Sequence, residues 1–189
     1  MATVLLVNGA ATPPGRLSAA IEFAAESART AGASADILSL SDTVLDICDG
    51  RPDDKYSAAT QDAVGRMIAA DAVLFGAPVY RASYPGVLKN LLDLAPVKAL
   101  QVKPVGILAV GGSPHHYLGV ESQMKDVLQW FGALVAPTNC YVTGGDFKDG
   151  QLASEGARKD LAALVTTLLT LAKLDKASLG PIPLAARYT

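Results

Sequence analysis

Three loops rich in glycine, proline and hydroxyl residues carry the chemistry that this sequence offers. They span residues 8–18, 77–84 and 111–117. The first loop leads into a helical pattern, and the free N–H groups and the dipole of a helix N-terminus favour an anion. Arg16 adds a guanidinium, and Thr12 and Ser18 add hydroxyl donors. The spacing matches neither GxxxxGK[ST] nor GxGxxG, which favours a phosphate monoester over a nucleotide P-loop or a dinucleotide. An ordinary turn, with glycines that serve only the backbone, is the alternative.

The second loop combines a rigid backbone with an aromatic ring at Pro78, Val79 and Tyr80. Such a loop suits a planar heterocycle, because the side chains can flank its faces while main-chain groups bond its polar edge. A Tyr80 that only caps the core is the alternative.

The third loop begins with Gly111 and Gly112, where the backbone can approach a ligand closely. His115 and His116 are adjacent, so their side chains diverge and no shared metal site is expected. Histidines that merely pack the loop are one interpretation; if either contacts a ligand, we expect it to be His115. The sequence has no evident Ser-His-Asp order or paired carboxylates. We therefore predict no catalytic side chain.

Short apolar runs alternate with helical periods, which predicts βαβ units around a mostly parallel sheet. Strands are expected at residues 4–7, 35–40, 72–75, 105–110 and 134–141. Helices should follow each strand, with Ser57 capping the second helix, Val64, Met67 and Ile68 as its buried stripe, and a turn at residues 147–150. This pattern predicts a flavodoxin-like doubly wound α/β sandwich with five parallel strands in the order 2-1-3-4-5. Ligands of such sheets bind beyond the carboxyl ends of the strands, where the three loops lie.

The bulk composition favours small-molecule partners. Sixteen basic residues face eighteen acidic ones, and no basic run suggests nucleic acid or a membrane surface. Cys48 and Cys140 suit reduced thiols. Neither a signal peptide nor a bilayer-spanning run is evident, so we expect a cytoplasmic protein. One domain at residues 1–173 and an extended tail at 174–189 are predicted.

The segment Ala-Pro-Val-Tyr-Arg-Ala-Ser-Tyr-Pro-Gly-Val-Leu-Lys-Asn-Leu-Leu-Asp at residues 77–93 resembles the most diagnostic part of the NAD(P)H-dependent FMN reductase family. Gly-Gly-Ser-Pro-His-His at residues 111–116 resembles the family's third flavin loop. The likeness covers residues 4 to about 173 and is nearest to the reductase components of two-component alkanesulfonate-type monooxygenases. It implies FMN with NADPH or NADH as cofactors, and the flavin itself performs the hydride chemistry.

The resemblance also assigns positions. It places the FMN phosphate at Thr12, Arg16, Leu17 and Ser18, and the isoalloxazine ring and ribityl chain at Pro78, Val79, Tyr80, Arg81 and Ser83, with Gly111, Gly112, Ser113 and His115 at the other ring edge. The first loop departs from the family's Gly-Ser-x-x-x-x-Ser pattern, since Ala10 replaces a serine and Leu17 a hydroxyl residue. Weaker phosphate binding would suit a flavin used as a diffusible substrate.

Family members form dimers or tetramers through the helix after the third flavin loop. In the alkanesulfonate-type members this helix carries a π-bulge, and Ser122 occupies the matching position. The leading hypothesis is therefore an FMN reductase that supplies a monooxygenase with reduced flavin. The alternatives are a flavoprotein with bound FMN that reduces quinones, azo compounds or metal oxyanions, and a flavodoxin-type electron carrier without a nicotinamide site. The near-neutral charge argues against the carrier.

Overall fold

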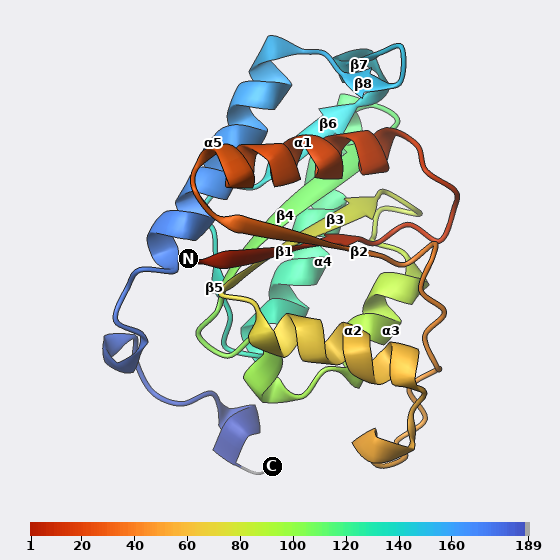
Figure 1. Cartoon of the computed structure of the whole chain (residues 1–189). Coiled ribbons are helices and arrows are strands. Elements are labelled where there is room, and N and C mark those ends of the chain that lie inside the picture. The colour runs from red at the N-terminus through yellow and green to blue at the C-terminus, as the bar shows by residue number, and fades with distance from the viewer. Residues whose placement is uncertain (188–189) are drawn as a thin grey trace.

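The computed structural model describes residues 1–187 and shows a parallel sheet between two layers of helices (Figure 1). The sheet order is β2-β1-β3-β4-β5, with β6 also paired to β4, which confirms the predicted flavodoxin-like order. The strands of this sheet are β1 (Thr3–Asn8), β2 (Ser34–Ser39), β3 (Ala72–Pro78), β4 (Pro104–Gly111), β5 (Leu134–Val135) and β6 (Cys140–Thr143). The helices are α1 (Arg16–Thr30), α2 (Ala58–Ala69), α3 (Gly86–Leu94), α4 (Tyr117–Trp130) and α5 (Glu155–Leu171).

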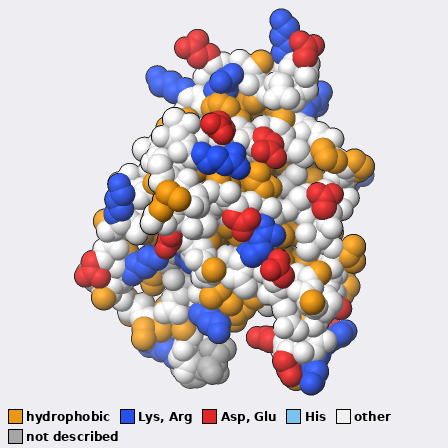
Figure 2. Space-filling model, viewed as in Figure 1, with side chains coloured by type: hydrophobic (Ala, Val, Ile, Leu, Met, Phe, Trp, Pro, Cys, Tyr) orange, Lys and Arg blue, Asp and Glu red, His pale blue; other side chains and the backbone are white. Residues whose placement is uncertain are grey.

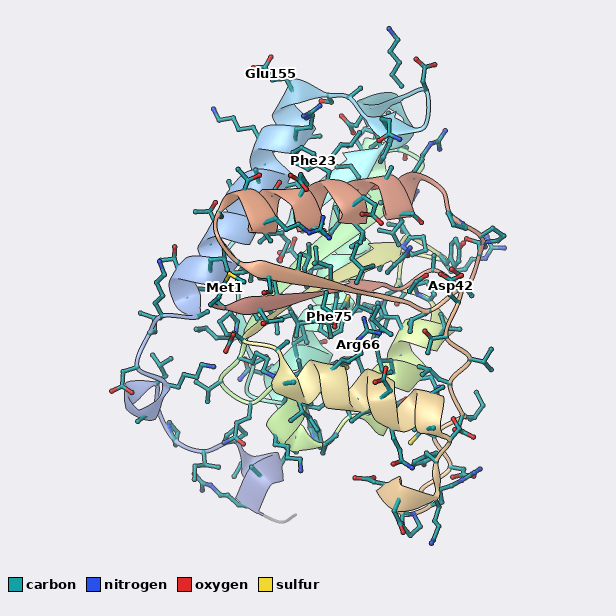
Figure 3. The ribbon with its side chains drawn as sticks, viewed as in Figure 1. Met1, Phe23, Asp42, Arg66, Phe75 and Glu155 are labelled. Carbon is teal, nitrogen blue, oxygen red and sulfur yellow. The ribbon has the colours of Figure 1, made fainter. Side chains whose placement is uncertain are left out.

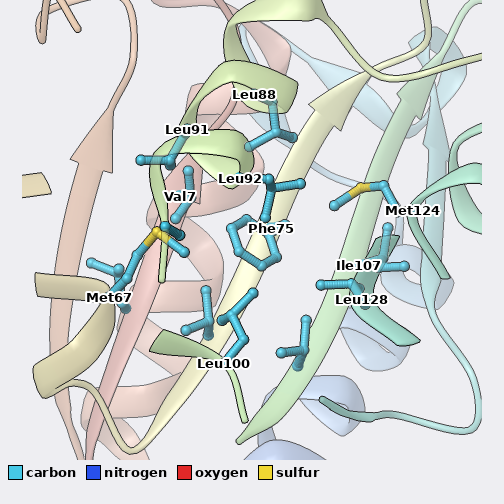
Figure 4. Packing of buried hydrophobic residues seen from close by; sticks show 14 of the residues in the cluster. Val7, Met67, Phe75, Leu88, Leu91, Leu92, Leu100, Ile107, Met124 and Leu128 are labelled. Carbon is cyan, nitrogen blue, oxygen red and sulfur yellow. The ribbon is translucent and has the colours of Figure 1, made fainter. Parts of the chain in front are cut away.

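The two faces of the sheet bury separate cores. α1 and α5 cover one face, and α2, α3 and α4 cover the other (Figure 1). On the second face the ring of Phe75 lies among Leu88, Leu92 and Leu100, as Figure 4 shows. Because helices cover both faces, β1, β3 and β4 read as continuous apolar runs rather than alternating ones.

Two charged side chains hold α2 in place. The Arg66 guanidinium, labelled in Figure 3, donates to both carboxylate oxygens of Asp36 on β2, at 2.9 Å from Nε and 2.6 Å from Nη2. The Lys103 ammonium donates to the carbonyls of Met67 and Ile68, at 2.5 and 2.9 Å, near the C-terminal end of α2. Burial lowers the pKa of Lys103 to about 8. Lys103 thus supplies donors to carbonyls at the end of α2, and Arg66 ties the same helix to β2.

The predicted buried stripe of α2 was partly wrong. Met67 is buried, but Val64 is only half-buried and Ile68 is 38% exposed. Thr60, Ala63 and Met67 form the inward face instead, because positions 60, 63 and 67 share one side of a 3.6-residue period while 64 and 68 lie beside it. The predicted cap at Ser57 is confirmed, since its hydroxyl accepts the N–H of Thr60.

The predicted fifth strand at residues 134–141 is broken in two. β5 pairs with the start of β4 and β6 with its end. Pro137 lies in the gap and has no N–H for a ladder bond. The side-chain oxygen of Asn139 accepts the N–H of Ile107 at 2.9 Å, so it replaces the missing backbone partner. The interrupted strand still ends at the same edge as β4.

The predicted turn at residues 147–150 is confirmed as the tip of a hairpin formed by β7 (Phe147–Lys148) and β8 (Gln151–Leu152). Asp149 and Gly150 have φ of 49° and 78°, the backbone of a two-residue primed turn. The hairpin stands beside the N-terminal end of α1 (Figure 1).

The described part of the C-terminal segment contains short turns of helix. Short 3-10 turns occur at Lys176–Ser178 and Leu184–Arg187. A Cβ built on Gly132 would lie 2.2 Å from Cγ of Pro183, so the segment packs against the end of α4. The division into residues 1–173 and 174–189 stays a prediction. None of the described helices is both long and apolar enough to cross a membrane.

Candidate functional site

The loops that leave β1, β3 and β4 meet at the carboxyl edge of the sheet, on the right-hand side of Figure 1. The N–H of Gly9 donates to the carbonyl of Gly76 at 2.8 Å, and the N–H of Val79 donates to that of Val110 at 2.9 Å. A cavity of about 300 Å³ lies between the loop after β1 and the ends of β3 and β4. It is lined by Ala10, Thr12, Pro13, Gly15, Arg16, Leu17, Ser18, Pro78 and Val110.

A buried asparagine that the sequence analysis did not single out organises the first loop. Asn8 is 5% exposed; its side-chain amide donates to Oγ of Ser18 at 3.0 Å, and its oxygen accepts the N–H of Ala10 at 3.3 Å. Oγ of Ser18 also accepts the N–H of Gly15 at 3.3 Å. The Ser18 hydroxyl therefore holds the loop together and keeps only its own hydrogen for a ligand.

Arg16 and Leu17 sit in the first turn of α1 but differ in what they present. Arg16 is exposed, its guanidinium lies against Gly144, and it forms no ion pair within residues 1–187. Leu17 is 6% exposed, and its side chain packs against Gly76, where a Cβ would lie 2.9 Å from its Cδ1. Leu17 thus offers only its N–H to the cavity. The first N–H groups of a helix have no partner within it.

The second loop contains a tight turn with unusual backbone angles. Tyr80 and Ser83 exchange two backbone hydrogen bonds of 2.8 and 3.0 Å. Between them Arg81 and Ala82 have φ of 52° and 60°, although neither is glycine. Such left-handed residues cost roughly 1–3 kcal/mol each and persist where the surroundings hold them. Within the described residues the N–H groups of Arg81 and Ala82 donate no hydrogen bond. They are therefore available to a ligand.

Two residues of α4, which the sequence analysis also missed, support this turn. The Ser83 hydroxyl donates to Oε1 of Gln123 at 2.8 Å. A Cβ built on Gly119 would lie 2.7 Å from the carbonyl oxygen of Ala82. The backbone of α4 therefore touches the turn directly, and only a glycine at this position allows the contact.

The third loop borders the cavity rather than lining it. The Tyr141 hydroxyl donates to the carbonyl of Ser113 at 2.6 Å, and burial raises its pKa, which keeps it protonated as a donor. A Cβ on Gly111 would collide with that hydroxyl, at 1.8 Å. Gly112, Ser113 and His115 are not among the residues that line the cavity, and both His115 and His116 are exposed.

The helix α4 runs without interruption through Ser122, whose Oγ donates to the carbonyl of Leu118 at 2.8 Å. The π-bulge of the alkanesulfonate-type members is thus not present at Ser122, where this chain departs from them. In the described residues no cluster of three or more His, Cys, Asp or Glu side chains could hold a metal.

The donor set fits FMN. Arg16, the Thr12 hydroxyl and the N–H groups opening α1 are all donors, as a phosphate dianion requires. Gly9 and Gly76 keep the loop after β1 close to β3, where a Cβ on Gly9 would lie 2.6 Å from the Gly76 carbonyl oxygen. A sheet of this order with an anion cradle at the switch point between β1 and β3 defines a flavodoxin-like α/β protein.

Comparison with known proteins identifies the family. The model of NADPH-dependent FMN reductases matches residues 2–148. An NAD(P)H-dependent FAD/FMN reductase of Geobacillus thermodenitrificans is 36% identical over 68% of this chain and 70% of its own length. The NADH-dependent FMN reductase SfnF of Pseudomonas fluorescens is 45% identical, over 50% of this chain and 51% of that protein.

A solved oxidoreductase structure from Corynebacterium diphtheriae, 23% identical, aligns over 91% of this chain and 97% of that one with a TM-score of 0.72, which supports the fold. The chain belongs to the NADPH-dependent FMN reductase family. Membership makes it an oxidoreductase with FMN and NADH or NADPH as its cofactors, as the sequence analysis predicted.

Alanine substitutions at two helical glycines test the contact between α4 and the strained turn. Gly119→Ala should push the Ala82 carbonyl aside and raise the KM for FMN about tenfold, equivalent to about 1.4 kcal/mol. Gly65→Ala, in α2 with nothing within 4 Å of the new Cβ, is the matched control. It should leave KM unchanged and stabilise the fold by about 0.5–1 kcal/mol. Equal KM values for the two variants would show that the turn does not position the flavin.

Proposed function

We propose that this chain transfers hydride from NADH or NADPH to FMN that binds and leaves as a substrate. The observation that carries the proposal is the cavity between the loop after β1 and the ends of β3 and β4, whose donors suit a phosphate monoester. When bound, the flavin accepts the hydride that the dihydronicotinamide gives up, and the protein supplies placement and electrostatics.

Each loop has its own part in this proposal. Arg16, Thr12 and the first N–H groups of α1 hold the phosphate. Pro78 and Val79 border the ring, while the unpaired N–H groups of Arg81 and Ala82 bond its polar edge. The third loop closes the opposite rim through Gly111, Gly112, Ser113 and His115.

The phosphate site offers few side-chain donors, and this supports the exchange of the flavin. Ala10 has no hydroxyl, the side chain of Leu17 points into the core, and Oγ of Ser18 already accepts two hydrogen bonds. Thr12 is exposed. Fewer charge-assisted bonds to the phosphate mean weaker retention, which suits delivery of reduced FMN to a flavin-dependent monooxygenase.

The proposal also includes a cytoplasmic location and a homodimer or homotetramer built on α4. Tyr117, Leu118 and Trp130 of this helix are 55%, 52% and 56% exposed. Trp130 borders a groove of about 420 Å³ between α3 and α4. Exposed aromatic and aliphatic side chains on one helix favour an interface between copies. Acidic and basic side chains are interspersed over the face in Figure 2, where no basic patch for nucleic acid is seen.

Arg16→Ala tests the phosphate assignment and thereby the function. The variant should raise the KM for FMN about tenfold or more while the KM for riboflavin, which lacks the phosphate, stays within twofold, because one charge-assisted bond contributes about 1.5–3 kcal/mol. Steady-state oxidation of NADH and NADPH with each flavin provides the measurement. Arg29→Ala, near the other end of α1, is the control and should change neither value. Equal losses with both flavins, or no flavin-stimulated oxidation in the unaltered protein, would refute the assignment.

Exchange of the flavin predicts its loss during purification. FMN added in excess should separate from the protein on gel filtration, and the protein peak should lack absorbance near the flavin bands. A peak that retains one FMN per chain would instead favour a flavoprotein that reduces quinones, azo compounds or metal oxyanions.

An interface on α4 predicts that a charged substitution in this helix lowers the mass of the oligomer. Trp130→Asp should shift the particle measured by light scattering toward the monomer, because a buried carboxylate without a partner opposes association. Val44→Asp replaces an exposed apolar side chain, 86% exposed, in the segment between β2 and α2, and should leave the mass unchanged. A monomeric parent protein would rule out this part of the proposal.

A further inference from the structure

The buried side chain of Asn8 stands at the end of β1, directly behind the phosphate cavity. It is 5% exposed, and its backbone is paired with Ser39 of β2 on one side and with Gly76 of β3 on the other. The carbonyl of Asn8 also accepts the N–H of Leu40 at 3.0 Å. The strand therefore holds the side-chain amide in one place, and no part of the proposed hydride transfer uses this amide.

The neighbours of Asn8 determine which way its amide faces. The N–H of Ala10 can only donate, so the atom that it meets at 3.3 Å is the amide oxygen. The amide nitrogen then faces Oγ of Ser18 at 3.0 Å and can only donate to it. The N–H of Gly15 donates to the same Oγ at 3.3 Å. These two donors occupy both lone pairs of the hydroxyl, so Ser18 can form a further hydrogen bond only by donating its own hydrogen.

The hydrogen of the Ser18 hydroxyl is left for a ligand. Ser18 lines the cavity together with Thr12 and Arg16, and within residues 1–187 the bonds of its Oγ are the two that it accepts. A hydroxyl that can only donate suits the oxygens of a phosphate dianion, which only accept, and a bond to an ionised acceptor is about twice as strong as a neutral one. A flavin that ends in a hydroxyl, such as riboflavin, forms only a neutral bond at this point.

We propose that Asn8 is a positioning residue that fixes the Ser18 hydroxyl as a donor, so that the site selects flavins with a phosphate over flavins that end in a hydroxyl. The inference rests on the proposed function and adds the residue that sets the polarity of the phosphate site. Asn8 acts through Ser18 and does not itself contact the phosphate. Without the amide, a lone pair of the hydroxyl is free and its hydrogen is no longer restricted to the cavity.

Asn8→Asp tests this role because it changes polarity and keeps shape. The carboxylate still accepts the N–H of Ala10, but it cannot donate to Ser18 and accepts the hydroxyl hydrogen instead. The dissociation constant of oxidised FMN, measured by quenching of flavin fluorescence, should rise about tenfold or more, while that of riboflavin stays within twofold.

Asn90→Asp is the matched control. The amide of Asn90 also holds a loop, through bonds of 2.8 and 2.9 Å to the backbone between β2 and α2, but Asn90 does not line the phosphate cavity. This variant should change neither dissociation constant by more than twofold.

Combination with Ser18→Ala shows whether Asn8 acts through the hydroxyl. Ser18→Ala alone should weaken FMN binding about tenfold. In that background only repulsion by the new carboxylate remains, so Asn8→Asp should weaken FMN by a factor at least threefold smaller than in the parent. Asn8→Ala repeats the cycle without a charge. It should weaken FMN several-fold in the parent and less than twofold in Ser18→Ala.

Riboflavin binding reports whether each variant is folded, and the Asn8→Ala cycle decides the question if Asn8→Asp does not fold. Equal factors in the two backgrounds would overturn the inference, because Asn8 would then act independently of Ser18. Equal losses of FMN and riboflavin, or unchanged FMN binding in Asn8→Asp or Ser18→Ala, would overturn it as well. A parent protein that neither binds nor reduces FMN would instead refute the proposed function, which separates the two failures.

Discussion

The site depends on the close approach of the loop after β1 to the neighbouring strand β3. Gly9 donates to Gly76 at 2.8 Å, and a Cβ at either glycine would lie within 3 Å of atoms from the other segment or from α1. This contact sets where α1 begins, and therefore where its free N–H groups and Arg16 point. Because Asn8 pairs with Gly76 and Pro78 with Val110, the loops after β1, β3 and β4 leave from one edge. A phosphate site and a ring site can form side by side only while that alignment holds.

The part of the site that we assign to the flavin ring depends on a strained turn and on the contacts that hold it. Arg81 and Ala82 occupy left-handed backbone, which the surrounding structure must stabilise. The Tyr80–Ser83 hydrogen bonds, the Ser83–Gln123 bond and the contact with Gly119 supply that support. Two of these contacts come from α4, the helix whose exposed aromatic residues we assign to an interface between copies. Under the proposed function, assembly and flavin placement would share one rigid element, and the amides of Arg81 and Ala82 would bond the flavin in a backbone conformation that is otherwise unfavourable.

Much of the fold was predictable because its signals are local. Continuous apolar strands, helical stripes and turn residues follow from burial, and they led to the observed sheet order. The break in the last strand was missed because Pro137 was read within an apolar run, and the Asn139 side chain that repairs the sheet acts across 32 residues. The loops of the site were found from glycine, proline and hydroxyl content, and family membership followed from the segment at residues 77–93.

The supporting residues could not be found in this way. Gly119, Gln123 and Tyr141 act through contacts with segments distant in the sequence, and nothing in their local pattern marks them. Asn8 acts within its own loop, on Ala10 and Ser18, but its type and spacing alone do not show these bonds. A glycine in a helix is ordinarily a mild defect, and only the position of Ala82 shows why Gly119 is needed. The family resemblance places Leu17 at the phosphate, but it does not show that the side chain turns into the core.

A crystal structure of the chain soaked with FMN would test the central claim most directly. The account predicts the phosphate at the first turn of α1 beside Arg16, with the ring against residues 78–83 and the Arg81 and Ala82 amides toward its polar edge. Flavin density elsewhere on the surface, or a ring that does not contact residues 78–83, would contradict it.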